Sequence, residues 1–199
     1  MQKELQYTST IRDFPLMFLE MKKTAILLCK GKTADEILRL SIDENIYRLE
    51  KEKRRRSMPM RMTKRLATLR MPLIKVLAYG TTYEGKLIAF LALMKAERIV
   101  FEYMMDVYKD KFDGDEITNL DFMQYADRLI SNSDVVAKWK TETLTEVNRR
   151  LKNILCDAGL AKRTKIGIVI QKPIVDREFC SLLDEDDWRY ARAILRKGY

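Results

Sequence analysis

The strongest constraint on what this chain can fold into is a series of local signals between residues 134 and 172. Residues 133–139 are predicted to form a short helix, and residues 140–143 a break. Thr143 followed three residues later by Glu146 fits a capping box, in which the hydroxyl and the carboxylate each accept a hydrogen bond from an amide at the start of a helix. The sequence therefore predicts two helices that are separated by a tight turn.

The second of these helices is predicted to be amphipathic and to lead into a β-ribbon. Its apolar residues recur at spacings that place them on one helical face, and they are Leu144, Val147, Leu151, Ile154 and Leu155. Gly159 follows where a left-handed C-terminal cap is favoured. Residues 160–175 are rich in β-branched side chains and contain Pro173, which is typical of a hairpin or an edge strand. This order of elements is that of a winged helix-turn-helix.

In a winged helix-turn-helix the second helix lies in the major groove of DNA. Arg and Asn side chains can pair bidentately with the edges of guanine and adenine, and both occur on the predicted outward face. The turn, the helix and the ribbon are therefore predicted to bind DNA through Lys140, Thr143, Asn148, Arg149, Arg150, Lys152, Asn153, Lys162, Arg163 and Lys165. The alternative interpretation is an ordinary amphipathic helix with a solvated basic face.

The net charge of +9 is unevenly distributed along the 199 residues. Residues 48–75 hold eleven basic and two acidic side chains, and residues 138–165 hold eight and three. These two blocks carry a surplus of +14 on a chain that is otherwise at −5. Segregated positive charge is typical of proteins that bind phosphates. Acidic proteins and acidic lipid surfaces would be attracted by the same charge, so the charge alone does not name the partner.

The first of these blocks contains the densest basic cluster of the chain. Its members are predicted to hold DNA phosphates, and they are Lys53, Arg54, Arg55, Arg56, Arg61, Lys64 and Arg65. Each cation that neutralises one phosphate adds about one unit to the salt dependence of binding. The alternative is a run of solvated surface charge or a flexible connection.

The first half of the chain is predicted to be a helical bundle. Asp13, followed by Phe14 and Pro15, is expected to start a helix, because proline is tolerated in the first turn. Two further helix starts are predicted from capping boxes, which are Thr33 with Glu36 and Ser41 with Glu44. They give this half a helix-turn-helix-like start of its own. Residues 83–112 are the most apolar part of the chain and are expected to form its buried centre.

The turn at residues 113–115 is predicted to separate two domains. Residues 1–112 are expected to form an N-terminal helical domain, and residues 113–199 a C-terminal winged helix-turn-helix-like domain. Thr118 with Asp121 is expected to cap its first helix. The predicted fold class is therefore mainly α, a helical bundle with helix-turn-helix features and a C-terminal winged-helix-like unit with a short β-hairpin.

The composition indicates a globular protein without catalytic machinery. No apolar run approaches the ~20 residues that span a bilayer, and the start of the sequence lacks a signal-peptide hydrophobic region. We therefore expect a cytoplasmic protein without membrane contact. The chain contains no histidine, which removes the commonest general base and zinc ligand. Residues 31–33 resemble the end of a phosphate loop, but Ile26 stands where that motif needs glycine.

Two further groups of residues have side chains of the kinds that form chemical sites. The three cysteines lie far apart in the sequence, and we expect them to be small apolar residues of the core. Residues 184–187 are four consecutive carboxylates, which we interpret as the start of a helix because acids there oppose the helix dipole favourably. We therefore expect no catalytic residues, no metal site, no cofactor and no enzymatic activity.

Several segments, in their order along the chain, resemble BrxA, a family of small components of the BREX phage-exclusion systems. They are residues 27–33, 43–45, 63–66, 87–103 and 157–160. The resemblance implies a helix-rich protein with helix-turn-helix features that lacks enzymatic activity and binds DNA. The family has also been likened to the NusB antitermination fold, which would imply RNA instead.

The combined prediction is a non-catalytic protein of a BREX anti-phage defence system that binds double-stranded DNA and contacts other BREX proteins. One alternative is an adaptor or scaffold protein, whose basic patches would meet acidic surfaces of larger defence components. The other alternative is a NusB-like module that binds RNA.

Overall fold

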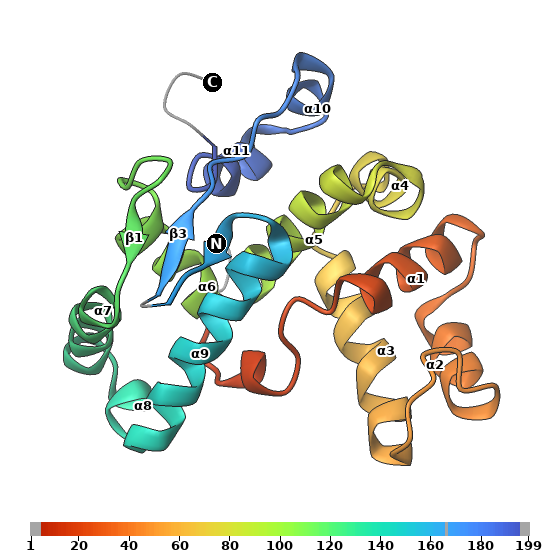
Figure 1. Ribbon diagram of the computed structural model, residues 1–199. Helices are drawn as coiled ribbons and strands as arrows, with labels where there is room; N and C mark the ends of the chain where they lie inside the picture. Colours follow the sequence, from red (N-terminus) through yellow and green to blue (C-terminus); the bar gives the residue numbers. More distant parts are fainter. Residues whose placement is uncertain (1–4, 166, 196–199) are drawn as a thin grey trace. The chain divides into compact units, whose positions relative to one another are not determined.

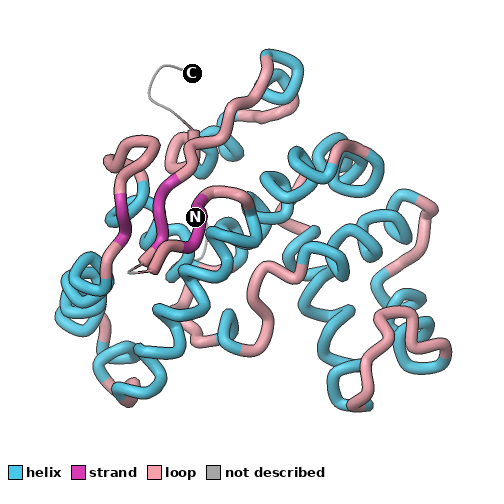
Figure 2. Tube along the Cα trace, viewed as in Figure 1, coloured by secondary structure: helices cyan, strands magenta, loops and turns pink. Residues whose placement is uncertain are grey.

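The computed structural model describes residues 5–165 and 167–195, which form two compact units (Figures 1 and 2). One unit consists of residues 17–96, and the other combines residues 5–16 with the chain from residue 97 onward. The boundary predicted between residues 112 and 113 does not coincide with this division. The apolar stretch from residue 83 to residue 112 crosses from one unit to the other, and its helices are separated at Glu97, whose backbone is extended with φ −128°.

The unit of residues 17–96 is a bundle of helices around a buried central one. Its helices are α1 (Phe18–Cys29), α2 (Ala34–Asp43), α3 (Glu52–Leu66), α4 (Met71–Tyr79) and α5 (Thr82–Ala96). Every residue of α5 from Leu87 to Met94 is buried, which explains why apolar residues occupy all its faces. Met21, Met58 and Leu73 belong to the same core.

The helix starts of this unit follow the sequence signals in part. Thr33 and Glu36 form the predicted capping box at the start of α2. The prediction that Ser41 caps a helix is wrong, because Ser41 lies inside α2 and its hydroxyl donates a hydrogen bond to the carbonyl of Arg55 at 2.6 Å. The helix expected after Asp13 begins instead at Phe18, behind Met17, whose backbone is left-handed with φ +53°.

The other unit places a small sheet among short and long helices. Its elements in chain order are η1 (Thr10–Arg12), α6 (Arg98–Tyr103), the π-helical η2 (Met104–Tyr108), β1 (Glu116–Ile117), α7 (Asn119–Asn132), α8 (Asp134–Ala137), α9 (Thr141–Ala158), β2 (Ala161–Arg163), β3 (Ile168–Ile170), α10 (Arg177–Ser181) and α11 (Glu185–Ala191). Strand β3 pairs antiparallel with β2 and with β1, so the sheet order is β1-β3-β2. The mainly α fold with a short hairpin is confirmed.

The start of the chain is anchored to this unit by polar contacts. The Tyr7 hydroxyl donates to Glu102 Oε2 at 2.6 Å, and the Thr8 hydroxyl donates to Glu97 Oε2 at 3.0 Å. The guanidinium of Arg98 lies over the Tyr7 ring at 4.3 Å and pairs with Glu102 at 2.7 Å. Residues 5–12 thus belong to the same unit as α6.

The long helix α9 starts earlier than the sequence suggested. It begins at Thr141, so the predicted capping box of Thr143 and Glu146 is wrong, because both residues lie inside the helix. Its apolar face is buried as predicted, apart from Leu144, which is half-buried, and Gly159 ends it in the left-handed conformation with φ +77°. The predicted capping box of Thr118 and Asp121 is present at the start of α7.

Candidate nucleic-acid interface

The hairpin presents basic side chains next to the exposed side of α9. Lys162, Arg163 and Lys165 are exposed, and Lys162 stands opposite Val169 in the hairpin register. Arg163 Nη2 donates a hydrogen bond of 2.5 Å to Asn153 Oδ1 on α9. Because this bond ties the hairpin to the helix, Asn153 orients a cation of the hairpin rather than presenting its carbonyl oxygen outward.

A single carboxylate holds the two arginines of α9. Arg149 donates from Nε and Nη2 to the two oxygens of Glu146 at 2.8 and 2.6 Å, and Arg150 Nε donates to Glu146 Oε1 at 2.9 Å. These hydrogen bonds, that of Arg149 first, lower the pKa of Glu146 to about 2, so it is ionised at neutral pH. The cluster therefore carries one net positive charge instead of two.

Two other residues predicted to face DNA lie at the edge of the buried face. Lys152 is half-buried, its ammonium donates to Asn119 Oδ1 at 2.7 Å, and burial lowers its pKa. Asn148 is also half-buried, and its buried Oδ1 finds no hydrogen-bond partner among the described residues. The exposed side of α9 contains Glu142 and Asp157 as well, so it is less basic than the sequence suggested.

The turn before α9 contributes one exposed cation. Lys140 is exposed in an extended conformation at the start of the helix, whereas Thr143 is half-buried. Together, the structure places Lys140, Arg149, Lys162, Arg163 and Lys165 of the predicted set at the exposed surface of this unit.

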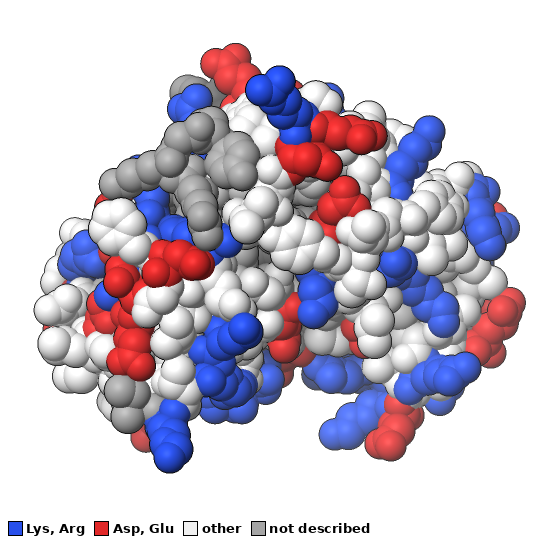
Figure 3. Space-filling model, turned by 45° about the horizontal axis from the view of Figure 1, so that its top comes forward, with Lys and Arg blue, Asp and Glu red and all other residues white. Residues whose placement is uncertain are grey.

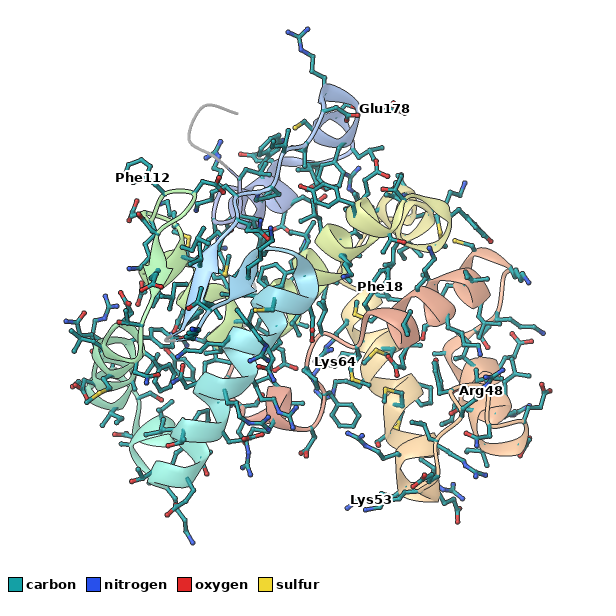
Figure 4. All side chains as sticks on the ribbon, in the orientation of Figure 1. Phe18, Arg48, Lys53, Lys64, Phe112 and Glu178 are labelled. Atoms are coloured by element: carbon teal, nitrogen blue, oxygen red, sulfur yellow. The ribbon has the colours of Figure 1, made fainter. Side chains whose placement is uncertain are left out.

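A stronger basic surface lies on α3 in the unit of residues 17–96. Lys53, Arg56, Met60 and Lys64 recur at helical spacing and are all exposed; we call these four residues the α3 stripe. Lys53 and Lys64 lie toward opposite ends of α3 (Figure 4). They are eleven positions apart in the helix, which corresponds to about 16 Å along the axis. Arg56 pairs with Glu52 at 2.9 Å, and both side chains remain largely exposed.

The remaining predicted residues of the α3 cluster are less accessible. Arg54, Arg55 and Arg61 are half-buried, and Arg55 Nε donates to the carbonyl of Leu49 at 2.9 Å. Arg65 is fully buried, so its prediction as a surface phosphate ligand is contradicted. The physical reason is helical phase, because Arg65 follows Met58 and Met62 on the face of α3 that packs into the core.

The net charge is concentrated in one of the two units. Residues 17–96 contain eighteen basic and eight acidic side chains, a surplus of +10, whereas the rest of the sequence contains twenty and twenty-one. Figure 3 shows how Lys and Arg side chains are distributed over one face of the molecule. The unit that carries the α3 stripe therefore holds the net positive charge, whereas acidic residues elsewhere in the other unit offset the basic block at residues 138–165.

The acidic run near the end of the chain has a structural role. Asp184 and Asp187 form a capping box at the start of α11, as expected of acids at that position. Within residues 5–165 and 167–195, no cluster of His, Cys, Asp or Glu side chains is arranged to hold a metal ion. None of the helices in those ranges combines the length and apolar character needed to cross a bilayer.

Comparison with known proteins assigns the family. The BrxA family model matches residues 5–187 of the chain. The BREX protein BrxA of a Bacillus cereus strain is 35% identical over 178 residues, which cover 88% of this chain and 89% of that relative. The crystal structure of an uncharacterized protein from Magnetospirillum magneticum has the same fold, with a TM-score of 0.78 at 23% identity over 96% of this chain and 99% of that one. The family match and the 35% identity show that the chain belongs to the BrxA family.

Proposed function

We propose that this protein is a non-catalytic component of a BREX defence system that binds double-stranded DNA. The observation that carries the proposal is the α3 stripe on a unit with a surplus of +10. Its exposed cations face solvent along about 16 Å of helix, a length comparable with the ~12 Å width of the major groove between its phosphate edges. Family membership supports the role in BREX, since the curated relative is named a BREX protein.

The second unit supports the same function with a second surface. A long helix followed by a basic hairpin is the arrangement by which winged helices dock on duplex DNA. The exposed cations of the hairpin suit contacts to the backbone, which position a protein without reading the sequence. Glu146 competes with phosphates for Arg149 and Arg150. We therefore assign the larger share of the electrostatic affinity to the α3 stripe.

A titration of fluorescent duplex DNA at several salt concentrations tests the proposal. We expect saturable binding whose logarithmic affinity falls linearly with the logarithm of salt, with a slope of about −0.9 for each phosphate contacted. Duplex RNA and heparin serve as competitors, because RNA binding and unspecific attraction of polyanions are the alternatives. Displacement by duplex RNA at equal or lower concentration than duplex DNA would favour an RNA-binding module instead.

Variants of the α3 stripe assign the binding surface. Lys53→Ala combined with Lys64→Ala should weaken binding and reduce the salt slope by about two, because each lysine is expected to neutralise one phosphate. Lys30→Ala combined with Lys75→Ala removes two exposed lysines of the same unit that lie outside α3; it is the matched control and should reduce the slope by less than one. Equal effects of the two changes would contradict a specific role of the α3 stripe.

A further inference from the structure

A line of exposed apolar side chains runs along α7 and continues onto α8. Leu120, Met123 and Ile130 lie on one side of α7 and are 61%, 60% and 38% exposed. Val135 on α8, directly after the end of α7, is 50% exposed. Single exposed apolar residues are ordinary, but large apolar side chains gathered along one helix mark a contact surface.

The same surface is acidic. Asp127 is exposed between Met123 and Ile130, and Asp134 is exposed beside Val135. We call these six residues the α7–α8 surface. Residues 97–137, which surround it in the sequence, contain ten acidic and four basic side chains. The complementary partner must therefore offer exposed apolar side chains among cations.

The α3 stripe has this composition. Met60 is 62% exposed, although methionine is usually buried, and three cations flank it on the exposed face of α3. The stripe and the α7–α8 surface both lie along helices, one apolar and basic and the other apolar and acidic. Each chain thus carries both halves of a complementary pair, on two different units.

A symmetric contact between two α7–α8 surfaces is disfavoured by charge. It would bring Asp127 of one copy toward Asp127 of the other within an apolar contact, where like charges repel most strongly. We propose that the α7–α8 surface of one copy binds the α3 stripe of a second copy. The contact is heterologous, because it joins two different surfaces, and we expect association to continue head to tail beyond the dimer.

Sedimentation velocity without nucleic acid tests this inference independently of the proposed function. At low salt the average mass should rise with protein concentration past that of a dimer, and ~0.5 M salt should reduce the association, because part of the attraction is electrostatic. Leu120→Asp should weaken association by about tenfold or more. Ile174→Asp, an equally exposed apolar residue in the same unit, should leave it unchanged. A protein that stays monomeric at every concentration and salt overturns the inference.

Mixing two defective variants identifies the geometry. Leu120→Asp removes one half of the pair and Lys64→Glu weakens the other, so each variant alone should be largely monomeric. Their equimolar mixture retains one intact α7–α8 surface and one intact α3 stripe, and it should form a complex that stops at the dimer. Failure of the mixture to associate would overturn the head-to-tail arrangement, and self-association of Lys64→Glu alone would indicate a symmetric contact between α7–α8 surfaces. Circular dichroism of each variant verifies that the helices are retained.

Discussion

Glu146 sets how much positive charge α9 can offer to a polyanion. Its carboxylate accepts three hydrogen bonds from Arg149 and Arg150, so both guanidinium groups are engaged before any phosphate arrives. In Glu146→Gln the attraction is lost while the side chain keeps its size. We expect this variant to bind duplex DNA of any sequence more tightly, with a salt slope steeper by about one to two units. Unchanged affinity in the salt titration would show that α9 does not face the DNA.

The low pKa of Glu146 also predicts how its effect on DNA affinity depends on pH. The pKa of Glu146 lies at about 2, below its ordinary value of 4.5, so the stabilisation from its ion pairs is present above pH 4.5 and is lost as the pH falls toward 2. Between pH 5 and pH 8 the effect of Glu146→Gln on DNA affinity should therefore be constant. A difference between variant and wild type that changes across this range would place another titrating group at the surface.

Gly159 offers a test of backbone conformation with little interference from packing. Its φ is +77°, and a Cβ added there would meet nothing within 4 Å. Gly159→Ala should thus destabilise the protein by about 1 kcal/mol through the left-handed conformation alone. Gly159→Asn should cost less, since asparagine tolerates this region better. Urea unfolding measures both, and equal stability of the alanine variant would contradict the cap.

At the scale of elements, Tyr7 docks residues 5–12 on α6. Tyr7→Phe removes the hydrogen bond to Glu102 and keeps the ring under Arg98, so we expect a loss of about 1 kcal/mol. Burial, followed by the bond to Glu102, raises the pKa of Tyr7 to about 12. The stabilisation is therefore present below pH 10 and is lost as the pH rises through 12. The free energy of unfolding of Tyr7→Phe and of the wild-type protein, measured at pH 7 and at pH 11, tests this, and the difference between them should be smaller at pH 11.

The sequence was sufficient for the elements whose signals are periodic. The buried face of α9, its glycine cap and the hairpin follow from spacing that only one local structure satisfies. Capping boxes predicted helix starts less reliably, because the same residue pattern also occurs inside helices. There the side chains have other partners: the Ser41 hydroxyl donates to a carbonyl of α3, and the Glu146 carboxylate accepts from two arginines. The burial of Arg65 could have been found, since its spacing from Met58 and Met62 places it on their face.

At the scale of the whole molecule, the two units could not be predicted from composition. One of these units depends on contacts between distant parts of the chain. Tyr7 and Glu102 are about half the chain apart, and the paired strands β1 and β3 are about fifty residues apart. No local pattern records such pairs. Likewise, the sequence divides the positive charge between two blocks, and only the fold assigns the surplus of +10 to one unit.

The division into units predicts how the two basic surfaces combine. Lys53→Ala with Lys64→Ala changes one unit, and Arg149→Ala with Arg150→Ala changes the other. Because the pairs belong to different units, we expect their losses of DNA-binding free energy to add within about 0.5 kcal/mol when all four changes are combined. The α3 pair should cause the larger loss. A combined variant no weaker than the α3 pair alone would mean that DNA contacts only the α3 stripe.

One unit is built from two separate segments of the chain, and this determines the order in which the two units can fold during synthesis on the ribosome. Residues 17–96 are contiguous, so all their mutual contacts are available as soon as residue 96 has emerged. The unit that includes residues 5–16 must wait for β3, near residue 170, because β3 joins β1 to β2. The nascent chain therefore completes its strongly cationic unit first, while residues 5–12 still lack the partner on which they will dock.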